Sequence, residues 1–67
     1  MAIMKSVQIM SESPKSFEQA IKNGITRFSK SVKDIKSVYV NDQSATVEGG
    51  DEKMFRVNMQ VTFKVND

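Results

Sequence analysis

The sequence predicts a single α+β domain over residues 1–67, with the element order strand, helix, strand, strand. Residues 54–65 alternate without a break between apolar and polar side chains, which is typical of a strand with one covered face. Residues 17–32 carry apolar side chains at intervals of three and four, which is typical of an amphipathic helix. We expect a three-stranded antiparallel sheet with residues 54–65 in its centre and the helix packed on one face.

The first strand is predicted over residues 3–11, where Ile3, Val7 and Ile9 share one face with Lys5 as the exception. The segment SESPKS then forms a loop, because Pro14 keeps the residues before it extended.

The helix is expected to begin after Ser16 and to continue to about Val32. Ser16 and Gln19 fit a capping box, in which the serine hydroxyl accepts from the amide of Gln19 and the glutamine side chain reaches back. Gly24 lies on the apolar stripe, where a glycine lowers the stability of the helix by about 1 kcal/mol relative to alanine. We therefore expect a close approach of the helix to the sheet at Gly24, with a merely tolerated small residue as the alternative.

The third and fourth elements form a predicted hairpin. Its turn is EGGDEK, in which Gly49 and Gly50 are suited to positive φ. Neither face of the strand before the turn is cleanly apolar under strict alternation. One face holds Val38, Val40, Asp42, Ser44 and Thr46, and the other holds Tyr39, Asn41, Gln43, Ala45 and Val47.

Composition excludes several classes of function. The chain has no cysteine and no histidine, which removes disulfides, thiolate metal sites and the commonest general base. Its serines therefore lack the usual partner of a nucleophile, and we expect no enzyme. The ten Lys and Arg residues are scattered among eight Asp and Glu, so a clustered basic face for nucleic acid is not expected.

Hydropathy predicts a soluble, cytoplasmic protein with no membrane partner. No apolar run approaches the ~18 residues of a membrane span. The segment MAIMKSVQIM lacks the apolar core and cleavage site of a signal peptide.

The lengths of the elements predict self-association. Residues 54–65 would extend over ~40 Å as a strand, whereas a helix over 17–32 would cover ~24 Å. Each apolar side chain that is left exposed loses ~1.5–3 kcal/mol of the stabilisation that burial would give. A chain this small buries only ~60% of the surface that its unfolded form exposes. We therefore expect copies of the same chain to cover the remaining apolar surface of the sheet.

Four stretches together resemble the dodecin family: SPKSFEQAI, the Gly24-Ile25 pair with Arg27, SVKDIKSVYVNDQSATV and FRVNMQVTFKV. The resemblance covers about residues 5–66. It implies a sheet wrapped around one helix and a hollow homododecameric shell that binds or stores a small ligand.

The resemblance further implies how flavin-binding dodecins hold their ligand. Pairs of flavins stack on a tryptophan of the second strand at a two-fold subunit interface, and an amide side chain of the last strand hydrogen-bonds the flavin ring. The register places Ser37 at the tryptophan position and Arg56 at the amide position, and the chain contains no tryptophan. Binding of riboflavin or FMN is therefore expected to be weakened or lost. The candidate cofactor-binding residues are Ser37, Tyr39, Asp42 and Arg56, with Tyr39 as a partial aromatic substitute.

Arg56 has two interpretations. Its guanidinium is suited to stacking on a ring or to binding a phosphate or carboxylate. The alternative is an ion pair with Asp42, with Glu48 or with an acid of a neighbouring chain.

Some family members without the tryptophan look like shells that hold calcium or have no assigned ligand, and this sequence resembles that subgroup. A structural or calcium-binding shell is therefore the alternative function. The candidate ligands are Glu48, Asp51 and Glu52 in the turn. Calcium takes six to eight oxygens, so symmetry-related copies would have to contribute, and a solvated turn is the alternative. The five methionines are expected to fill gaps in the core or in an interface.

Overall fold

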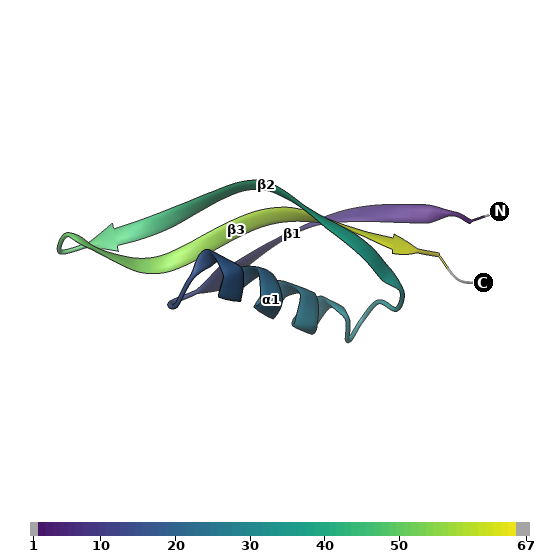
Figure 1. Ribbon diagram of the computed structural model, residues 1–67, viewed down its shortest axis with the longest axis horizontal. Coiled ribbons are helices and arrows are strands. Elements are labelled where there is room, and N and C mark those ends of the chain that lie inside the picture. The colour runs from purple at the N-terminus through teal and green to yellow at the C-terminus, as the bar shows by residue number, and fades with distance from the viewer. Residues whose placement is uncertain (1, 66–67) are drawn as a thin grey trace.

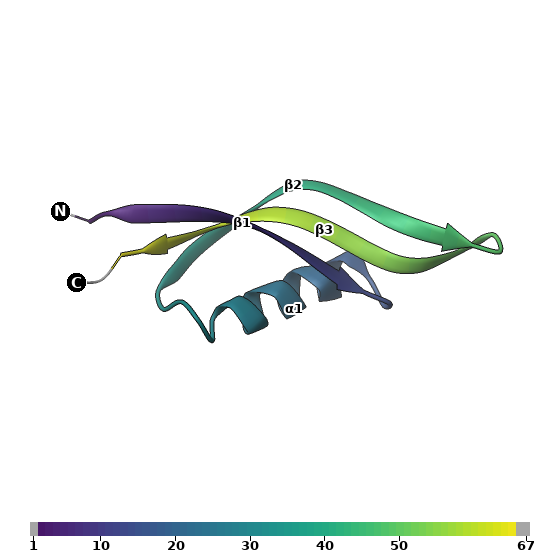
Figure 2. The ribbon, with the colours of Figure 1, turned by 180° about the vertical axis from the view of Figure 1, so that it is seen from behind.

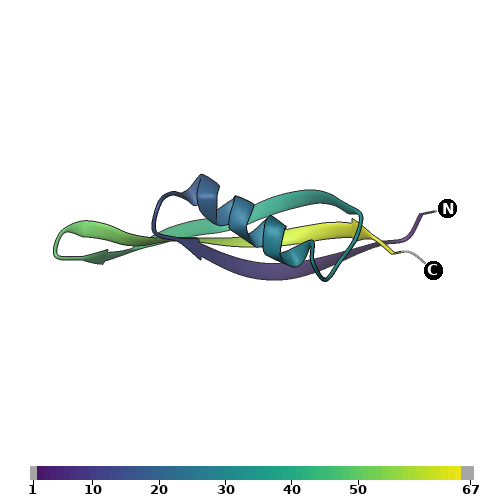
Figure 3. The same ribbon diagram turned by 90° about the horizontal axis from the view of Figure 1, so that it is seen from below.

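The computed structural model describes residues 2–65 and contains four elements: β1 (Met4–Ser13), α1 (Phe17–Phe28), β2 (Ile35–Glu48) and β3 (Asp51–Lys64). The strands form one sheet in the order β1-β3-β2, and both pairings are antiparallel. Helix α1 lies across one face of this sheet (Figure 1, Figure 3). The predicted fold class, element order, hairpin and central position of the last strand are confirmed.

The core lies between α1 and the centre of β3. Val57, Met59 and Val61 are fully buried, as is Ala20 of α1. These residues alternate along β3, as the sequence predicts, because side chains two apart in a strand share a face. Partly buried apolar side chains of all the other elements pack around them, namely Ile9, Phe17, Ile21, Val38 and Val40.

Strand β2 departs from the strict alternation assumed for it. Its pairing with β3 shifts between Ile35 and Ser37 and again between Val40 and Asp42. Each shift is a β-bulge, which inserts one residue and reverses the faces beyond it. The expectation from the sequence that Asp42 shares a face with Val40 is therefore wrong.

The bulges explain why neither face of β2 looked apolar. Beyond the second bulge, Gln43 pairs with Val57 and Ala45 pairs with Phe55, so this part of β2 presents Gln43 and Ala45 on the α1 side. A third register shift separates Thr46 from Val47 close to the turn. The turn has the expected positive φ, 61° at Gly49 and 87° at Gly50.

Half of the predicted capping box is present at the start of α1. The Ser16 hydroxyl accepts from the backbone amide of Gln19 at 2.9 Å. The Gln19 side chain does not reach back, because its amide instead donates to Asn23 Oδ1 at 2.8 Å.

The helix is one turn shorter than predicted. After Phe28 the chain tightens, with the amide of Lys30 donating to Arg27 and that of Ser31 donating to Phe28. The Ser29 hydroxyl also donates to the Thr26 carbonyl at 2.8 Å. Serine side chains compete in this way with helical backbone bonding, which accounts for the early end.

The close approach predicted at Gly24 is confirmed. Gly24 is buried, and a Cβ added there would collide with Met59 Cε and lie 3.1 Å from Ser11 Cβ. The missing side chain lets α1 rest directly on β1 and β3.

The molecule is elongated, with extents of 52 × 20 × 13 Å and a radius of gyration of 13.7 Å. A compact domain of this length would have a radius of gyration of ~11 Å. The twelve residues of α1 cover ~18 Å, whereas the fourteen residues of β3 extend over ~46 Å. The tip of the β2–β3 hairpin consequently projects beyond α1 (Figure 2). The difference in length between the central strand and the helix is therefore larger than the sequence predicted.

Replacing Gly24 by valine should lower the free energy of unfolding by about 1–3 kcal/mol, because the new side chain overpacks the contact with Met59. Urea denaturation at one fixed protein concentration measures this, since subunit association also contributes to stability. Lys22→Val, at an exposed position of the same helix, is the matched control and should cost less than about 0.7 kcal/mol. Equal effects of the two substitutions would contradict the close packing at Gly24.

Candidate ligand-binding face

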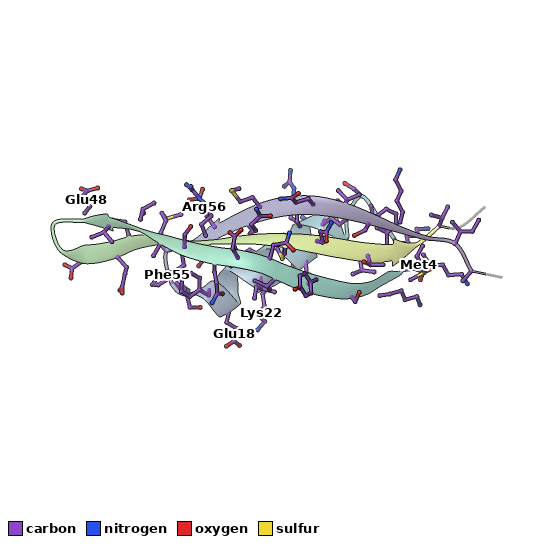
Figure 4. The ribbon with its side chains drawn as sticks, turned by 90° about the horizontal axis from the view of Figure 1, so that it is seen from above. Met4, Glu18, Lys22, Glu48, Phe55 and Arg56 are labelled. Carbon is purple, nitrogen blue, oxygen red and sulfur yellow. The ribbon has the colours of Figure 1, made fainter. Side chains whose placement is uncertain are left out.

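The four predicted cofactor-binding residues lie on one face of the sheet, the face that α1 does not cover, which we call the open face. In β2, Ser37 pairs with Thr62, Tyr39 with Gln60 and Asp42 with Asn58. Paired residues project from the same side of a sheet. Arg56 lies two residues from Asn58 in β3 and projects from this side as well. Figure 4 looks onto the open face and labels Arg56.

Strand β1 contributes a third column of side chains, which the sequence analysis did not single out. Gln8 lies opposite Gln60, and Met10 lies opposite Asn58. The Gln8 amide donates to Asn58 Oδ1 at 2.8 Å. The antiparallel register of β1 against β3, rather than any motif, is the signal that places these amides beside the candidate residues. The open face is thus rich in groups that hydrogen-bond to heteroatoms.

Tyr39 is the only aromatic residue on the open face within residues 2–65. Its side chain is accessible, with 69% of the residue exposed, and Ser37 beside it is also exposed. The phenylalanines belong to the other side of the sheet and pack edge to face, Phe17 on Phe55 and Phe28 on Phe63, at centroid distances of 5.1 and 6.1 Å. The open face therefore offers one ring for stacking.

Arg56 pairs with an acid that the sequence analysis did not name. Its Nη2 donates to Glu12 Oε2 at 3.1 Å, so the expected pairing with Asp42 or Glu48 is wrong within the chain. The reason is the register, because Glu12 of β1 lies directly opposite Arg56. The Arg56 Nε is enclosed and has no acceptor among residues 2–65. The side chains are 42% and 40% exposed, so this pair is a weak one.

The three acids of the hairpin turn do not converge. Glu48 pairs with Asp51 on one face, whereas Glu52 pairs with Val47 on the other. Within the described residues, no group of three acidic side chains is arranged to hold a metal ion. A cation at this turn would need oxygens from other copies of the chain.

The Dodecin family model matches residues 3–66. The chain belongs to the dodecin family. A calcium dodecin of Mycobacterium tuberculosis is 32% identical over 65 residues, which cover 97% of this chain and 92% of that protein.

Solved dodecin structures share this fold over the whole domain. The dodecin from Streptomyces davaonensis matches with a TM-score of 0.94 at 26% identity, covering 98% of this chain and 97% of that one. The calcium-chelating dodecin from Mycobacterium tuberculosis, which has a calcium-binding site, matches with a TM-score of 0.83 at 31% identity over 96% and 91% of the two chains. No helix within residues 2–65 of this dodecin is long and apolar enough to cross a bilayer.

The exposure of the Arg56–Glu12 pair sets its strength. A double-mutant cycle with Glu12→Gln and Arg56→Gln should give a coupling free energy below about 1 kcal/mol, which decreases further as salt is raised. Urea denaturation of the four proteins measures it. A coupling that is large and independent of salt would show that the pair is desolvated and would contradict the weak pair described above.

Proposed function

We propose that this dodecin forms a homo-oligomeric shell, twelve copies by family analogy, whose open face binds a small ligand. The observation that carries the proposal is the gathering of Ser37, Tyr39, Asp42 and Arg56 on one hydrogen-bonding face that the chain itself leaves uncovered. The elongated shape and small core support the oligomeric part, because a 67-residue chain with so little buried surface gains most from association.

The open face fits a flavin only in part. Flavin rings are flat and aromatic, so stacking provides an attraction beyond the area that is buried. Ser37 supplies no ring, and Tyr39 supplies one phenol two residues along the same face. The amides and Arg56 can donate to ring oxygens or to a phosphate, but exposed hydrogen bonds of this kind contribute only ~0.5–1.5 kcal/mol each. We therefore infer that riboflavin or FMN binds more weakly than in dodecins with the tryptophan.

Flavin affinity should depend on residue 37. With the native protein at micromolar concentration, the fluorescence of riboflavin and FMN should be quenched weakly, and Ser37→Trp should raise the affinity at least about tenfold by restoring a stacking surface. Ser6→Trp is the matched control, because Ser6 lies on the open face in the same rung but on the other edge strand. If Ser37→Trp binds no better than Ser6→Trp, the assignment of the site to this part of the open face is wrong.

A calcium-binding shell is the second candidate function. It is supported by the 32% identity to a calcium dodecin and by the position of Glu48, Asp51 and Glu52 at a hairpin tip that projects beyond α1. These carboxylates do not form a site within one chain, so this function requires neighbouring copies to complete the six to eight oxygens that calcium prefers.

If calcium is the ligand, Glu48→Gln with Asp51→Asn should weaken its binding at least about tenfold, because carboxylate charge sets calcium affinity. Isothermal titration calorimetry of the assembled protein with CaCl₂ measures this. Glu18→Gln, on the exposed surface of α1, is the control and should leave the affinity unchanged. No heat of binding for the native protein, or equal losses in both variants, would remove the hairpin turn as a calcium site.

A further inference from the structure

One end of the molecule gathers lysines that are scattered along the sequence. Within residues 3–7, 29–37 and 62–65 there are five lysines, and Asp34 is the one acid. The fold brings these segments together, because Lys5 of β1 pairs with Phe63 of β3 and the backbone amide of Lys64 donates to the Asp34 carbonyl. Lysines that are dispersed in the sequence therefore share one end of the fold. The five are Lys5, Lys30, Lys33, Lys36 and Lys64.

A groove opens at this lysine-rich end, with a volume of about 370 Å³. Val32, Phe63 and Val65 give it an apolar floor, and Val65 is 38% exposed. Lys33 and Lys64 stand at its rim. The groove therefore combines an apolar surface with positive charge.

The opposite end of the 52 Å long axis has complementary chemistry. In Figure 4, Glu48 marks this hairpin tip and Met4 marks the lysine-rich end. The tip carries Glu48, Asp51 and Glu52, and Val47 beside them is 66% exposed. It stands free of the rest of the chain, since a Cβ at Gly49 or Gly50 would meet no atom within 4 Å.

We propose that the hairpin tip of one copy, residues 47–52, docks into the lysine-rimmed groove of the next copy. Val47 would then lose its exposure against the floor formed by Val32 and Phe63, and the tip carboxylates would approach Lys33 and Lys64. The two surfaces lie at opposite ends of the 52 Å long axis, so a chain cannot fill its own groove. Such head-to-tail contacts are heterologous and close into a ring when the rotation between copies allows it.

This contact rests on the proposed self-assembly and specifies which surfaces meet. A polyanion is a less suitable occupant of the groove, because it would not bury the apolar floor. It would also leave the exposed Val47 and the acidic tip unexplained. Complementary charges at the rim fix which surfaces meet and steer them together, whereas like charges placed there are strongly unfavourable.

Charge reversal tests the contact. Lys33→Glu with Lys64→Glu, and separately Glu48→Lys with Asp51→Lys, should each raise the apparent dissociation constant of the assembly at least about a hundredfold. Combining all four substitutions in one chain should restore assembly, because the charges are then exchanged between tip and groove. Light scattering after size exclusion, at low and high salt, measures the mass of each particle, and circular dichroism confirms that each variant is folded.

Lys15→Glu with Lys22→Glu is the matched control, since it changes the net charge equally at exposed positions outside the groove. Loss of assembly in this control, or normal assembly in both reversed variants, would overturn the contact. A quadruple variant, with all four charges reversed, that folds but stays dissociated would also overturn the contact. If the lysine variant assembles normally and loses only its retention on heparin, the groove end serves a polyanion and the contact is wrong. A native protein that is itself monomeric would instead refute the proposed self-assembly.

Discussion

The burial of β3 beneath α1 is the interaction on which the rest of the structure depends. Val57, Met59 and Val61 lose all contact with solvent because α1 lies directly over them, and Gly24 permits that approach. The helix has only twelve residues, however, and the strands of the hairpin have fourteen each. One short helix therefore creates a core at the middle of the sheet and leaves both ends of the sheet without cover. The small core and the elongated shape are two results of this single constraint.

The sequence predicted the parts of the fold that depend on local patterns. The alternation of residues 54–65 identified the central strand, the glycines at 49 and 50 identified the turn, and Gly24 identified the closest contact of helix and sheet. Strand β2 was predicted as an extended segment, but its faces were assigned wrongly beyond Val40. Bulges depend on how a strand must bend over the helix, which is a tertiary requirement that period-two alternation does not contain. The end of α1 was missed because the Ser29 hydroxyl donates to the Thr26 carbonyl there and competes with helical backbone bonding.

The candidate site shows the same division. The sequence could place Ser37 and Tyr39 on a common face, because they are two residues apart in one strand. It could not identify Glu12 as the partner of Arg56, since the two are separated by 44 positions and meet only through the register of β1 with β3. The lysines of the groove end come from three segments, so their clustering was equally invisible in the sequence. Contacts between distant segments could be found only in the structure, whereas patterns that repeat within one segment could be predicted from the sequence.

The bulges of β2 have a consequence beyond the placement of side chains. In the order β1-β3-β2, the long strand β2 lies at an edge of the sheet, where unpaired backbone groups can template fibril growth by another chain. Irregularities beside Lys36 and Asn41, together with the lysine itself, interrupt the flat row of donors and acceptors that such growth requires. The edge that β2 offers is therefore a poor template for amyloid-like stacking of a further strand.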